Sequence, residues 1–404
     1  GQLNTYEYSG IPGLRQQGFQ EIDIVGVTYP IVKHSYMVKD VSMLADTVRE
    51  AMKIAQSGRP GPVLIDIPKD IQIPLAEYTP ADKIKPLKAP AYDEELIDKA
   101  VEMIKESKRP YIYCGGGAVK SRCCHDIMSF SDKIDAPIGT SMMGLSSIPH
   151  TFSKGLGMCG MHGHYASTAA MYESDLIIAM GVRFSDRATG DKSKYSLDKK
   201  IIHIDIDPAE IGKNTQPLIP VVGDIKDVLT QLLPLVGDFK TTPSWDGEMK
   251  ELNKKYAQKI DSADNGFVNP KYFLKVLSEK TNSDVYLSTE VGQNQIWSCA
   301  YHIVKDGRFL TSGGMGTMGY SIPAAMGAKR GNPDKQVVAV CGDGSFQMSM
   351  MELATIMQHH IPVKIIVMKN NYLGMVREYQ HYTYKDHYSV VDIKDGSPDL
   401  EKLS

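Results

Sequence analysis

Two short polar motifs follow apolar, strand-like runs at positions suited to metal chemistry. Gly342-Asp343-Gly344-Ser345 comes directly after the run 337–341, and Asn370 follows the run 363–368. Parallel strands present their carboxyl ends at one edge of a sheet, where such sheets bind ligands. Asp343 and Asn370 carry the hard oxygen atoms that Mg²⁺ prefers, and glycine lets backbone amides approach a phosphate at a helix N-terminus. The pattern predicts a Mg²⁺-bridged diphosphate site.

The spacing between the two motifs distinguishes one common binding site from two unrelated turns. Either motif alone is compatible with a simple turn or strand exit. Asp343 and Asn370 are 27 positions apart (370 − 343), which leaves room for one helix and one strand between them. One strand-helix-strand unit of this length delivers both residues to the same edge. The pair therefore favours a common site.

The remaining sequence predicts an α/β chain in which the end of one unit is followed by two further units. A helix at 41–56 and a strand at 63–67 precede a proline-rich linker. Later strands are expected at 111–114, 136–140, 176–180, 201–206, 285–288, 337–341 and 363–368. Alternation of strands with helices is typical of doubly wound parallel sheets. The predicted domains are 1–75, 93–236 and 269–404, joined by linkers at 76–92 and 237–268.

Composition excludes several classes of function. The 404 residues have a net charge of −3 and no basic tract, which argues against nucleic acid or an anionic membrane as partner. No apolar run approaches the roughly 18 residues of a membrane span. The six cysteines form no C-x-x-C pair, so we expect reduced, buried thiols in a cytoplasmic protein that acts on small molecules. A start at Gly1 and a polar end suggest a fragment.

Additional motifs resemble one enzyme family. The paired Gly-Asp-Gly and Asn-Asn pattern resembles the signature of thiamine-diphosphate enzymes. More specific segments are similar to the catalytic subunit of acetolactate synthase (acetohydroxyacid synthase): Phe19-Gln20-Glu21, Gly58 to Asp70, Gly160-Met161-His162-Gly163, Thr311 to Tyr320 and Gly374-Met375-Val376-Arg377. The resemblance extends from Gly1 to about Gln380.

The resemblance implies a fold of three doubly wound parallel-sheet domains, of which the first and last would be incomplete here. They would bind the pyrimidine ring, FAD and the diphosphate, with the active site between two subunits of a homodimer or tetramer and a possible small regulatory subunit. Asp343, Asn370 and the carbonyl of Tyr372 would hold Mg²⁺. The expected thiamine-diphosphate contacts are Gln293, Asn294, Gly316, Met318, Gly342, Asp343, Gly344, Ser345, Asn370, Tyr372 and Met375.

The implied reaction joins two 2-keto acids. Pyruvate would lose CO₂ on thiamine diphosphate, and the remaining two-carbon unit would pass to a second pyruvate or to 2-ketobutyrate, in branched-chain amino-acid biosynthesis. Met318 matches the residue that holds the cofactor bent. Positions that match the substrate channel are Phe19, Gln20, Lys39, Met161, Asp186, Arg187, Val376 and Tyr379.

The chain also departs from the family pattern. The family's catalytic glutamate would lie upstream of Gly1, so this chain alone is expected to be inactive. Tyr379 stands where tryptophan is usual, at a position associated with choice of the second keto acid. Asn294 stands where histidine is common, and Lys369 replaces the first asparagine of the usual pair.

FAD, as a structural cofactor, is implied for the central domain. On their own, Gly115-Gly116-Gly117 after a strand and Asp205 near a strand end are weak indications of a nucleotide site. The full set of family positions is Gly115, Gly116, Gly117, Met142, Met161, His162, Gly181, Arg183, Asp186, Arg187, Asp205, Ile206, Gly223, Asp224, Gln295, Gly313 and Gly314.

Several alternatives stay open at this point. Met318 is compatible with an ordinary core methionine, Lys39 with a solvated lysine and His162 with a packed histidine. Another FAD-containing thiamine-diphosphate enzyme, such as glyoxylate carboligase or pyruvate oxidase, would share the metal motif. A non-catalytic nucleotide-binding or regulatory protein is the alternative of a different class.

Overall fold

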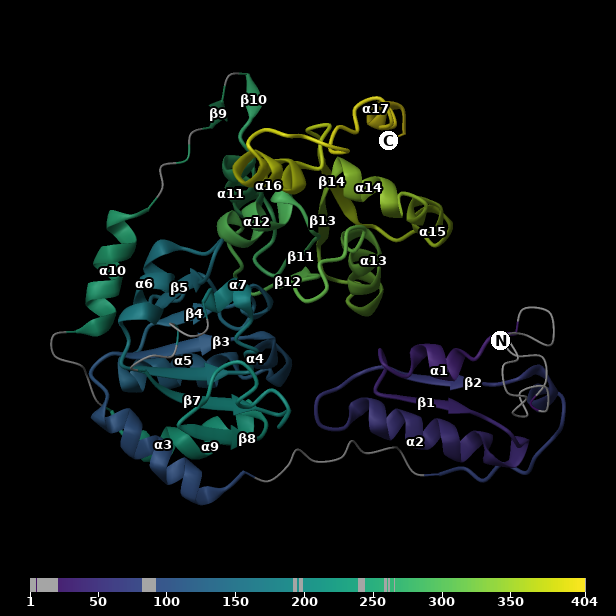
Figure 1. Ribbon diagram of the computed structural model, residues 1–404, viewed down its shortest axis with the longest axis horizontal. Helices are drawn as coiled ribbons and strands as arrows, with labels where there is room; N and C mark the ends of the chain where they lie inside the picture. Colours follow the sequence, from purple (N-terminus) through teal and green to yellow (C-terminus); the bar gives the residue numbers. More distant parts are fainter. Residues whose placement is uncertain are drawn as a thin grey trace. The chain divides into compact units, whose positions relative to one another are not determined.

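A computed structural model describes most of the chain (Figure 1). The described residues are 5, 21–81, 92–191, 195, 199–238, 244–257, 260, 262–264 and 266–403. They form two compact units, 1–91 and 92–404, which are treated separately below. The predicted channel residues Phe19 and Gln20 lie outside the described residues.

The first unit contains a short parallel β-pair. Its elements are α1 (Ile24–Thr28), β1 (His34–Met37), the 3-10 helix η2 (Val41–Met43), α2 (Leu44–Gln56), β2 (Val63–Asp66) and the 3-10 helix η3 (Lys69–Gln72). β1 and β2 are parallel, with Tyr36 opposite Ile65. The expected helix and strand are therefore present, although the first residues of the helix form a separate 3-10 turn. Lys39 is exposed just after β1.

The second unit begins with a six-stranded sheet in which every neighbouring pair is parallel. The strand order is β5-β4-β3-β6-β7-β8. The strands are β3 (Pro110–Cys114), β4 (Ile138–Thr140), β5 (Gly155–Met158), β6 (Leu176–Met180), β7 (Lys200–Asp205) and β8 (Ile219–Val222). Sequence patterns did not predict the edge strands β5 and β8. Glycine in β5 and proline in β8 weaken the strand signal.

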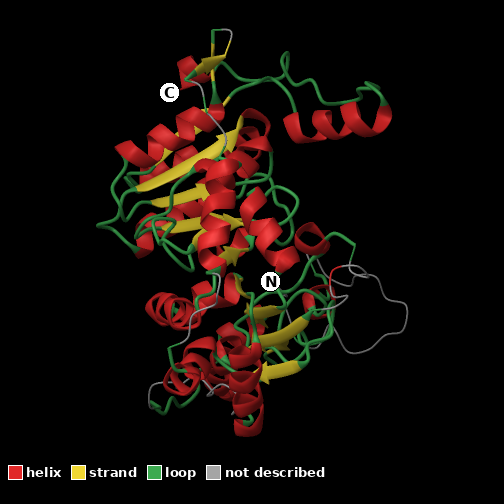
Figure 2. Ribbon diagram, turned by 90° about the vertical axis from the view of Figure 1, so that its left-hand side faces the viewer, coloured by secondary structure: helices red, strands yellow, loops and turns green. Residues whose placement is uncertain are grey.

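Helices cover both faces of this sheet (Figures 1 and 2). They are α3 (Glu94–Glu106), α4 (Gly116–Ser121), α5 (Cys124–Ile134), η4 (Met142–Gly144), α6 (Tyr165–Glu173), α7 (Asp186–Thr189), α9 (Ile225–Val236) and α10 (Trp245–Lys255). In β3, Ile112 and Cys114 share a core with α3, α5 and α9. Tyr111 and Tyr113 share another with α6 and α10. Alternate residues of one strand thus face opposite helical layers, as a doubly wound sheet requires.

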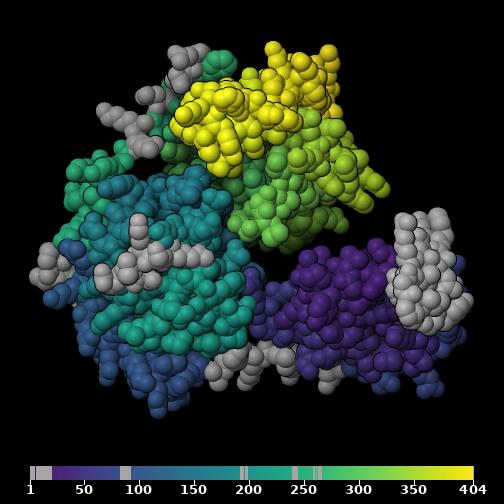
Figure 3. All heavy atoms as spheres, in the orientation of Figure 1, coloured from purple at the N-terminus to yellow at the C-terminus, as the bar shows by residue number. Residues whose placement is uncertain are grey.

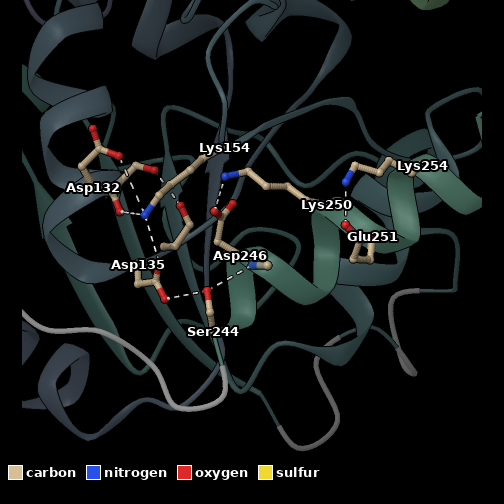
Figure 4. A network of polar contacts seen from close by, with 11 residues as sticks. Asp132, Asp135, Lys154, Ser244, Asp246, Lys250, Glu251 and Lys254 are labelled. Atoms are coloured by element: carbon tan, nitrogen blue, oxygen red, sulfur yellow. Dashed lines mark hydrogen bonds and ion pairs between the residues drawn. The ribbon is translucent and has the colours of Figure 1, made fainter.

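A polar network fixes the start of α10 to this sheet (Figure 4). The buried ammonium of Lys154 lies 3.0 Å from Asp135 Oδ1, and Ser244 Oγ donates to Asp135 Oδ2 at 3.4 Å. Ser244 is also the N-cap of α10. Trp245 is fully buried and donates from Nε1 to the carbonyl of Pro110 at 3.1 Å. Because these contacts join α10 to β3 and to Asp135 after α5, the helix packs with the six-stranded sheet.

The second sheet of this unit has four parallel strands in the order β12-β11-β13-β14. They are β11 (Tyr286–Thr289), β12 (Arg308–Thr311), β13 (Val337–Gly342) and β14 (Lys364–Met368). The surrounding elements are the ribbon β9 (Ala263–Asp264) and β10 (Phe267–Val268) and helices α11 (Pro270–Lys280), α12 (Gln293–Tyr301), α13 (Ser321–Gly331), α14 (Asp343–Ser349), α15 (Glu352–Gln358), α16 (Gly374–Tyr384) and α17 (Leu400–Leu403). Only β12 had not been predicted among the four strands.

The structure confirms the α/β class with parallel sheets. All six cysteines are free, and every one except the half-buried Cys124 is buried. Burial raises the pKa of Cys159 to about 11, which is the behaviour of a packed thiol and not of a reactive one. Within the described residues, no helix combines the length and apolar character needed to cross a bilayer.

Candidate functional site

Asp343 and Asn370 meet at the carboxyl edge of the four-stranded sheet. β13 and β14 are neighbours, with Gly342 opposite Met368, so the residues that follow them emerge side by side. Asp343 Oδ2 accepts hydrogen bonds from the backbone N–H groups of Asn370 at 3.1 Å and Asn371 at 2.6 Å. The Asp343 side chain is 4% exposed. The predicted pair is therefore one local structure.

The turn after β14 presents further oxygen atoms. Asn370 Oδ1 accepts from the N–H of Tyr372 at 2.9 Å, and Asn371 adopts a left-handed conformation with φ of 64°, which asparagine tolerates better than most residues. Asp343 Oδ1 accepts from the N–H of Gly344 at 3.1 Å. An oxygen that accepts one hydrogen bond, as Asp343 Oδ1 and Asn370 Oδ1 do, keeps a second acceptor position. One carboxylate, one amide and nearby backbone carbonyls suit Mg²⁺, which retains water and phosphate ligands. In the described part of the chain, no group of three or more His, Cys, Asp or Glu residues could hold a metal.

Close packing at two glycines gathers other predicted residues here. A Cβ on Gly344 would lie 2.8 Å from Leu373 Cδ2 and 3.8 Å from Met318 Cε. A Cβ on Gly374 would lie 2.3 Å from Gln293 Oε1 and 2.9 Å from Asn370 Nδ2. A side chain at either position would force the end of a neighbouring side chain to move. Met318 and Gln293 thus lie beside the Asp343–Asn370 pair.

The start of α12 completes this cluster. Asn294 is buried and donates from Nδ2 to the carbonyl of Glu290 at 3.1 Å. Ser345 Oγ donates to the carbonyl of Val291 at 3.3 Å. Gln295, predicted near FAD, is buried and donates from Nε2 to Thr311 Oγ1 at 2.7 Å. The segment between β11 and α12 therefore supports both Asn294 and Ser345.

A hollow of about 420 Å³ opens beside the pair. It is lined by Gln293, Asn370, Tyr372, Gly374, Arg377, Glu378, His381, Tyr382 and Tyr388. The guanidinium of Arg377 lies over the rings of Tyr372 and Tyr388, at 4.9 and 4.4 Å from their centroids. Sequence reasoning named Arg377 within a family-like segment but did not single out the last four lining residues. The C-terminal segment that carries them, yellow in Figure 3, forms part of the visible surface.

Predicted channel residues on α16 lie on the surface of this unit. Val376 and Tyr379 are exposed, and Met375 is half-buried. The Tyr379 ring contacts Tyr384, with 5.8 Å between centroids. Their placement on the helix that begins at Gly374 puts them one to two turns from Asn370 along the chain.

The carboxyl edge of the six-stranded sheet carries the other candidate set. Because all six strands are parallel, the segments that follow them reach one edge. Those segments hold Gly115, Gly116, Gly117, Met142, Met161, His162, Gly181, Arg183, Asp186, Arg187, Asp205, Ile206, Gly223 and Asp224. Met161, His162, Arg183, Asp186 and Arg187 are exposed. The topology brings these sequence-distant positions to one side of the sheet.

Contacts within the chain account for some residues of this set. A Cβ on Gly115 would lie 2.0 Å from the carbonyl oxygen of Gly181, and the N–H of Gly117 donates to the same oxygen at 3.1 Å. Glycine is therefore required for packing between two loops, apart from any nucleotide. Asp224 caps α9 by accepting from the N–H of Lys226 at 2.9 Å. Asp205 accepts from the N–H of Asp207 at 2.9 Å.

The glycine-rich segment after β12 links the two edges. A Cβ on Gly313 would lie 2.7 Å from Met143 Sδ, and a Cβ on Gly314 would lie 3.6 Å from Arg183 Nη2. The same segment contains Gly316 and Met318, which belong to the cluster around Asp343. The two candidate sites are therefore neighbours within the second unit.

One buried acid escaped sequence reasoning. Glu290 follows β11 and is 0% exposed, and burial raises its pKa. No motif marks it, because Ser-Thr-Glu after a strand is unremarkable as sequence. The N–H of Asn371 also reaches Asp343, a backbone contact that depends on the turn after β14 and that no side-chain motif marks.

Comparisons with known proteins identify relatives that cover nearly the whole chain. Residues 97–232 match the central domain of thiamine pyrophosphate enzymes, and residues 290–404 match their C-terminal thiamine-pyrophosphate-binding domain. The acetolactate synthase large subunit of Cyanidium caldarium is 39% identical over 401 residues, covering 96% of this chain and 68% of the relative. The subunit of Corynebacterium glutamicum is 38% identical, with 98% and 65% covered. A probable acetolactate synthase large subunit of Methanocaldococcus jannaschii is 41% identical, with 96% and 68% covered.

Proposed function

Because the chain belongs to the family of acetolactate synthase large subunits, we propose that it carries the thiamine-diphosphate chemistry of that enzyme. The reaction is the condensation of two pyruvates to 2-acetolactate with loss of CO₂. In the parallel reaction, 2-ketobutyrate is the second substrate and the product is 2-aceto-2-hydroxybutyrate. The protein would serve branched-chain amino-acid (isoleucine and valine) biosynthesis in the cytoplasm.

The observation that carries the proposal is the Asp343–Asn370 pair. Asp343 is buried and is oriented by the N–H groups of Asn370 and Asn371. It faces a turn that carries several oxygen atoms able to bind a metal. Mg²⁺ bound by Asp343, Asn370 and the carbonyl of Tyr372 would anchor a diphosphate. Amides around Gly344 and the side chains of Gln293, Asn294 and Ser345 would surround the phosphate oxygens. The carboxylate of Asp343 also accepts from the N–H of Gly344 at 3.1 Å, so backbone groups from two segments fix its orientation beside Asn370.

The proposed roles of the chain's own residues are binding and orientation. Thiamine diphosphate, when bound, supplies the carbanion chemistry that decarboxylation of a 2-keto acid requires. Met318 packs near Gly344 and would hold the cofactor in its bent form. Met375 would contact the cofactor, and Val376 and Tyr379 would line the approach of the second keto acid. Lys39, with Phe19 and Gln20, would contribute from the pyrimidine-binding domain.

FAD is proposed for the edge of the six-stranded sheet. The donors there suit an extended dinucleotide: exposed Arg183 and Arg187, and glycine backbone near Gly116. We divide the protein accordingly into pyrimidine-binding (1–75), FAD-binding (93–236) and diphosphate-binding (269–404) domains. The assembly would be a homodimer or tetramer with a possible small regulatory subunit.

The activity can be tested directly. Purified protein is incubated with pyruvate, thiamine diphosphate, MgCl₂ and FAD, and acid then converts any 2-acetolactate to acetoin, which is measured by colour. Acetoin that depends on both thiamine diphosphate and Mg²⁺ supports the proposal. CO₂ release from glyoxylate without acetoin from pyruvate would indicate glyoxylate carboligase. Acetoin formation that is equal without thiamine diphosphate or Mg²⁺ would contradict the proposal. If the protein binds thiamine diphosphate but neither substrate reacts, the cofactor site is kept, and the result is the one expected of this chain alone.

A further inference from the structure

The segment Glu290–Val291, at the carboxyl end of β11, contacts several parts of the diphosphate site. The carbonyl of Glu290 accepts from Asn294 Nδ2 at 3.1 Å, and the carbonyl of Val291 accepts from Ser345 Oγ at 3.3 Å. A Cβ on Gly316 would lie 3.8 Å from Val291 Cγ2. Three predicted cofactor contacts from three different elements therefore converge on two residues.

The side chain of Glu290 adds a contact to a fourth element. Its Oε2 accepts from the backbone N–H of Ser321 at 3.1 Å, and Ser321 is the first residue of α13. The helix N-terminus carries a partial positive charge that attracts a carboxylate. In the described structure, Oε1 of Glu290 is buried and has no hydrogen-bond partner. The carboxylate is thus directed at the start of α13.

A buried, charged carboxylate lowers the stability of the fold unless its charge makes an interaction that a neutral side chain could not make. Glu290 is 0% exposed, and removing a charge from water is unfavourable even when one hydrogen bond is regained. The residues just before α13 are the glycine-rich segment 312–320, which carries Gly316 and Met318. Restraining Ser321 therefore restrains the attachment point of Met318, whose Cε lies 3.8 Å from a Cβ placed on Gly344.

We propose that Glu290 is a positioning residue of the thiamine-diphosphate site, which holds the start of α13, and with it Met318, in register with the Gly342-Asp343-Gly344 segment. The inference rests on the proposed function, since it assigns Glu290 to that cofactor site. Glu290 does not contact the cofactor in this account. It acts through Ser321, Asn294 and the segment between them.

A purely structural helix cap would behave differently from a positioning residue. Loss of a cap lowers the stability of the fold and leaves the cofactor affinity of the folded protein unchanged. Loss of a positioning residue weakens cofactor binding even where the protein is folded. Affinity and thermal stability must therefore be measured on the same samples.

The experiment compares Glu290→Gln, Glu290→Asp and a matched control in the full 404-residue chain. Glutamine keeps the size of the side chain and removes its charge, whereas aspartate keeps the charge and shortens the reach to Ser321. The control is Ser278→Ala, because Ser278 is also buried, at 2% exposed, and hydrogen-bonds His302 and Ile303, which are not among the predicted cofactor contacts. Calorimetric titration with thiamine diphosphate in MgCl₂ gives each Kd, and circular dichroism gives each melting temperature.

The expected result separates the variants. Glu290→Gln weakens thiamine-diphosphate binding at least tenfold, Glu290→Asp weakens it three- to fivefold, and Ser278→Ala stays within twofold despite a lowered melting temperature. Binding by both Glu290 variants within twofold of the unchanged protein would overturn the inference and leave the proposed cofactor site standing. If Glu290→Gln does not fold, Glu290→Asp alone decides by the same criterion. If the unchanged protein does not bind thiamine diphosphate, both the role of Glu290 and the proposed cofactor site are contradicted.

Discussion

The two sheet edges of the second unit present contrasting chemistry on the same topology. At the four-stranded edge, two acids are buried, Asp343 and Glu290, and each accepts backbone N–H groups. At the six-stranded edge, Asp205 and Asp224 accept hydrogen bonds from turns and a helix start, while Arg183 is exposed. The first edge concentrates negative charge, as the proposed cation would need. The second offers glycine backbone and exposed cationic groups, as an extended anionic ligand would need.

The largest expected effect is on the binding of thiamine diphosphate, at the buried carboxylate of Asp343. Asp343→Asn should weaken binding of thiamine diphosphate in MgCl₂ by about 100-fold, since hydrogen bonds to a charged group contribute roughly 1.5–3 kcal/mol each and the metal loses its carboxylate ligand. Titration calorimetry measures the change. Asp334→Asn, an exposed acid before β13, is the control and should bind normally. Equal affinity in both variants would contradict the assignment of the metal site.

At the other edge, substitution of a glycine should affect folding instead. Gly115→Ala would place a methyl group 2.0 Å from the carbonyl oxygen of Gly181, so the free energy of unfolding should fall by about 1–3 kcal/mol or more. Urea denaturation measures it. Gly327→Ala is the control, because nothing lies within 4 Å of its Cβ position and alanine favours a helix interior. A stable Gly115→Ala protein would show that this packing is not required.

The junction between the two sheets should weaken in acid. The backbone N–H of His150 donates to the carbonyl of Val304 at 2.8 Å, and burial lowers the pKa of both His150 and His302 to about 4. A lowered histidine pKa means that the unfolded chain binds more protons below pH 6.5. Stability is therefore complete above pH 6.5 and is lost as the pH falls toward 4.

The lowered pKa values set the size of this loss of unfolding free energy, and an exposed histidine provides a control. At pH 5 each histidine should cost of the order of 2 kcal/mol relative to pH 7.5, measured as the difference in unfolding free energy by urea titration. His302→Gln should reduce the difference, because the titrating group is gone. The control is His359→Gln, which replaces an exposed histidine. A flat profile in the unchanged protein would contradict the buried neutral state.

The smallest expected effect concerns the exposed charges of the six-stranded edge. Asp186 and Arg187 lie at the limit of an ion pair, 4.0 Å apart and largely exposed, and such pairs contribute about 0–1 kcal/mol. Asp186→Asn should therefore leave the melting temperature almost unchanged. Any effect should appear only in FAD affinity, followed by flavin fluorescence. A marked loss of stability would mean that this edge relies on charge as the other one does.

Sequence patterns predicted the features that depend on local spacing. The Asp343–Asn370 pair followed from two strands and one crossover, and most strands were found from β-branched runs. Edge strands β5 and β8 were missed because glycine and proline interrupt their pattern. Glu290 was missed because its importance comes from tertiary burial at the start of α13, which no local pattern encodes. Gly115 was expected to face a nucleotide, whereas its contact with Gly181 is visible only once β3 and β6 are neighbours.

The central claim is that the edge carrying Asp343 and Asn370 binds thiamine diphosphate through Mg²⁺. Calorimetric titration of the unchanged protein with thiamine diphosphate, once in MgCl₂ and once in excess EDTA, tests it most directly. We predict saturable binding at one site per chain in MgCl₂ and its loss in EDTA. Binding that is equally strong in EDTA, or no binding in MgCl₂, would contradict the account.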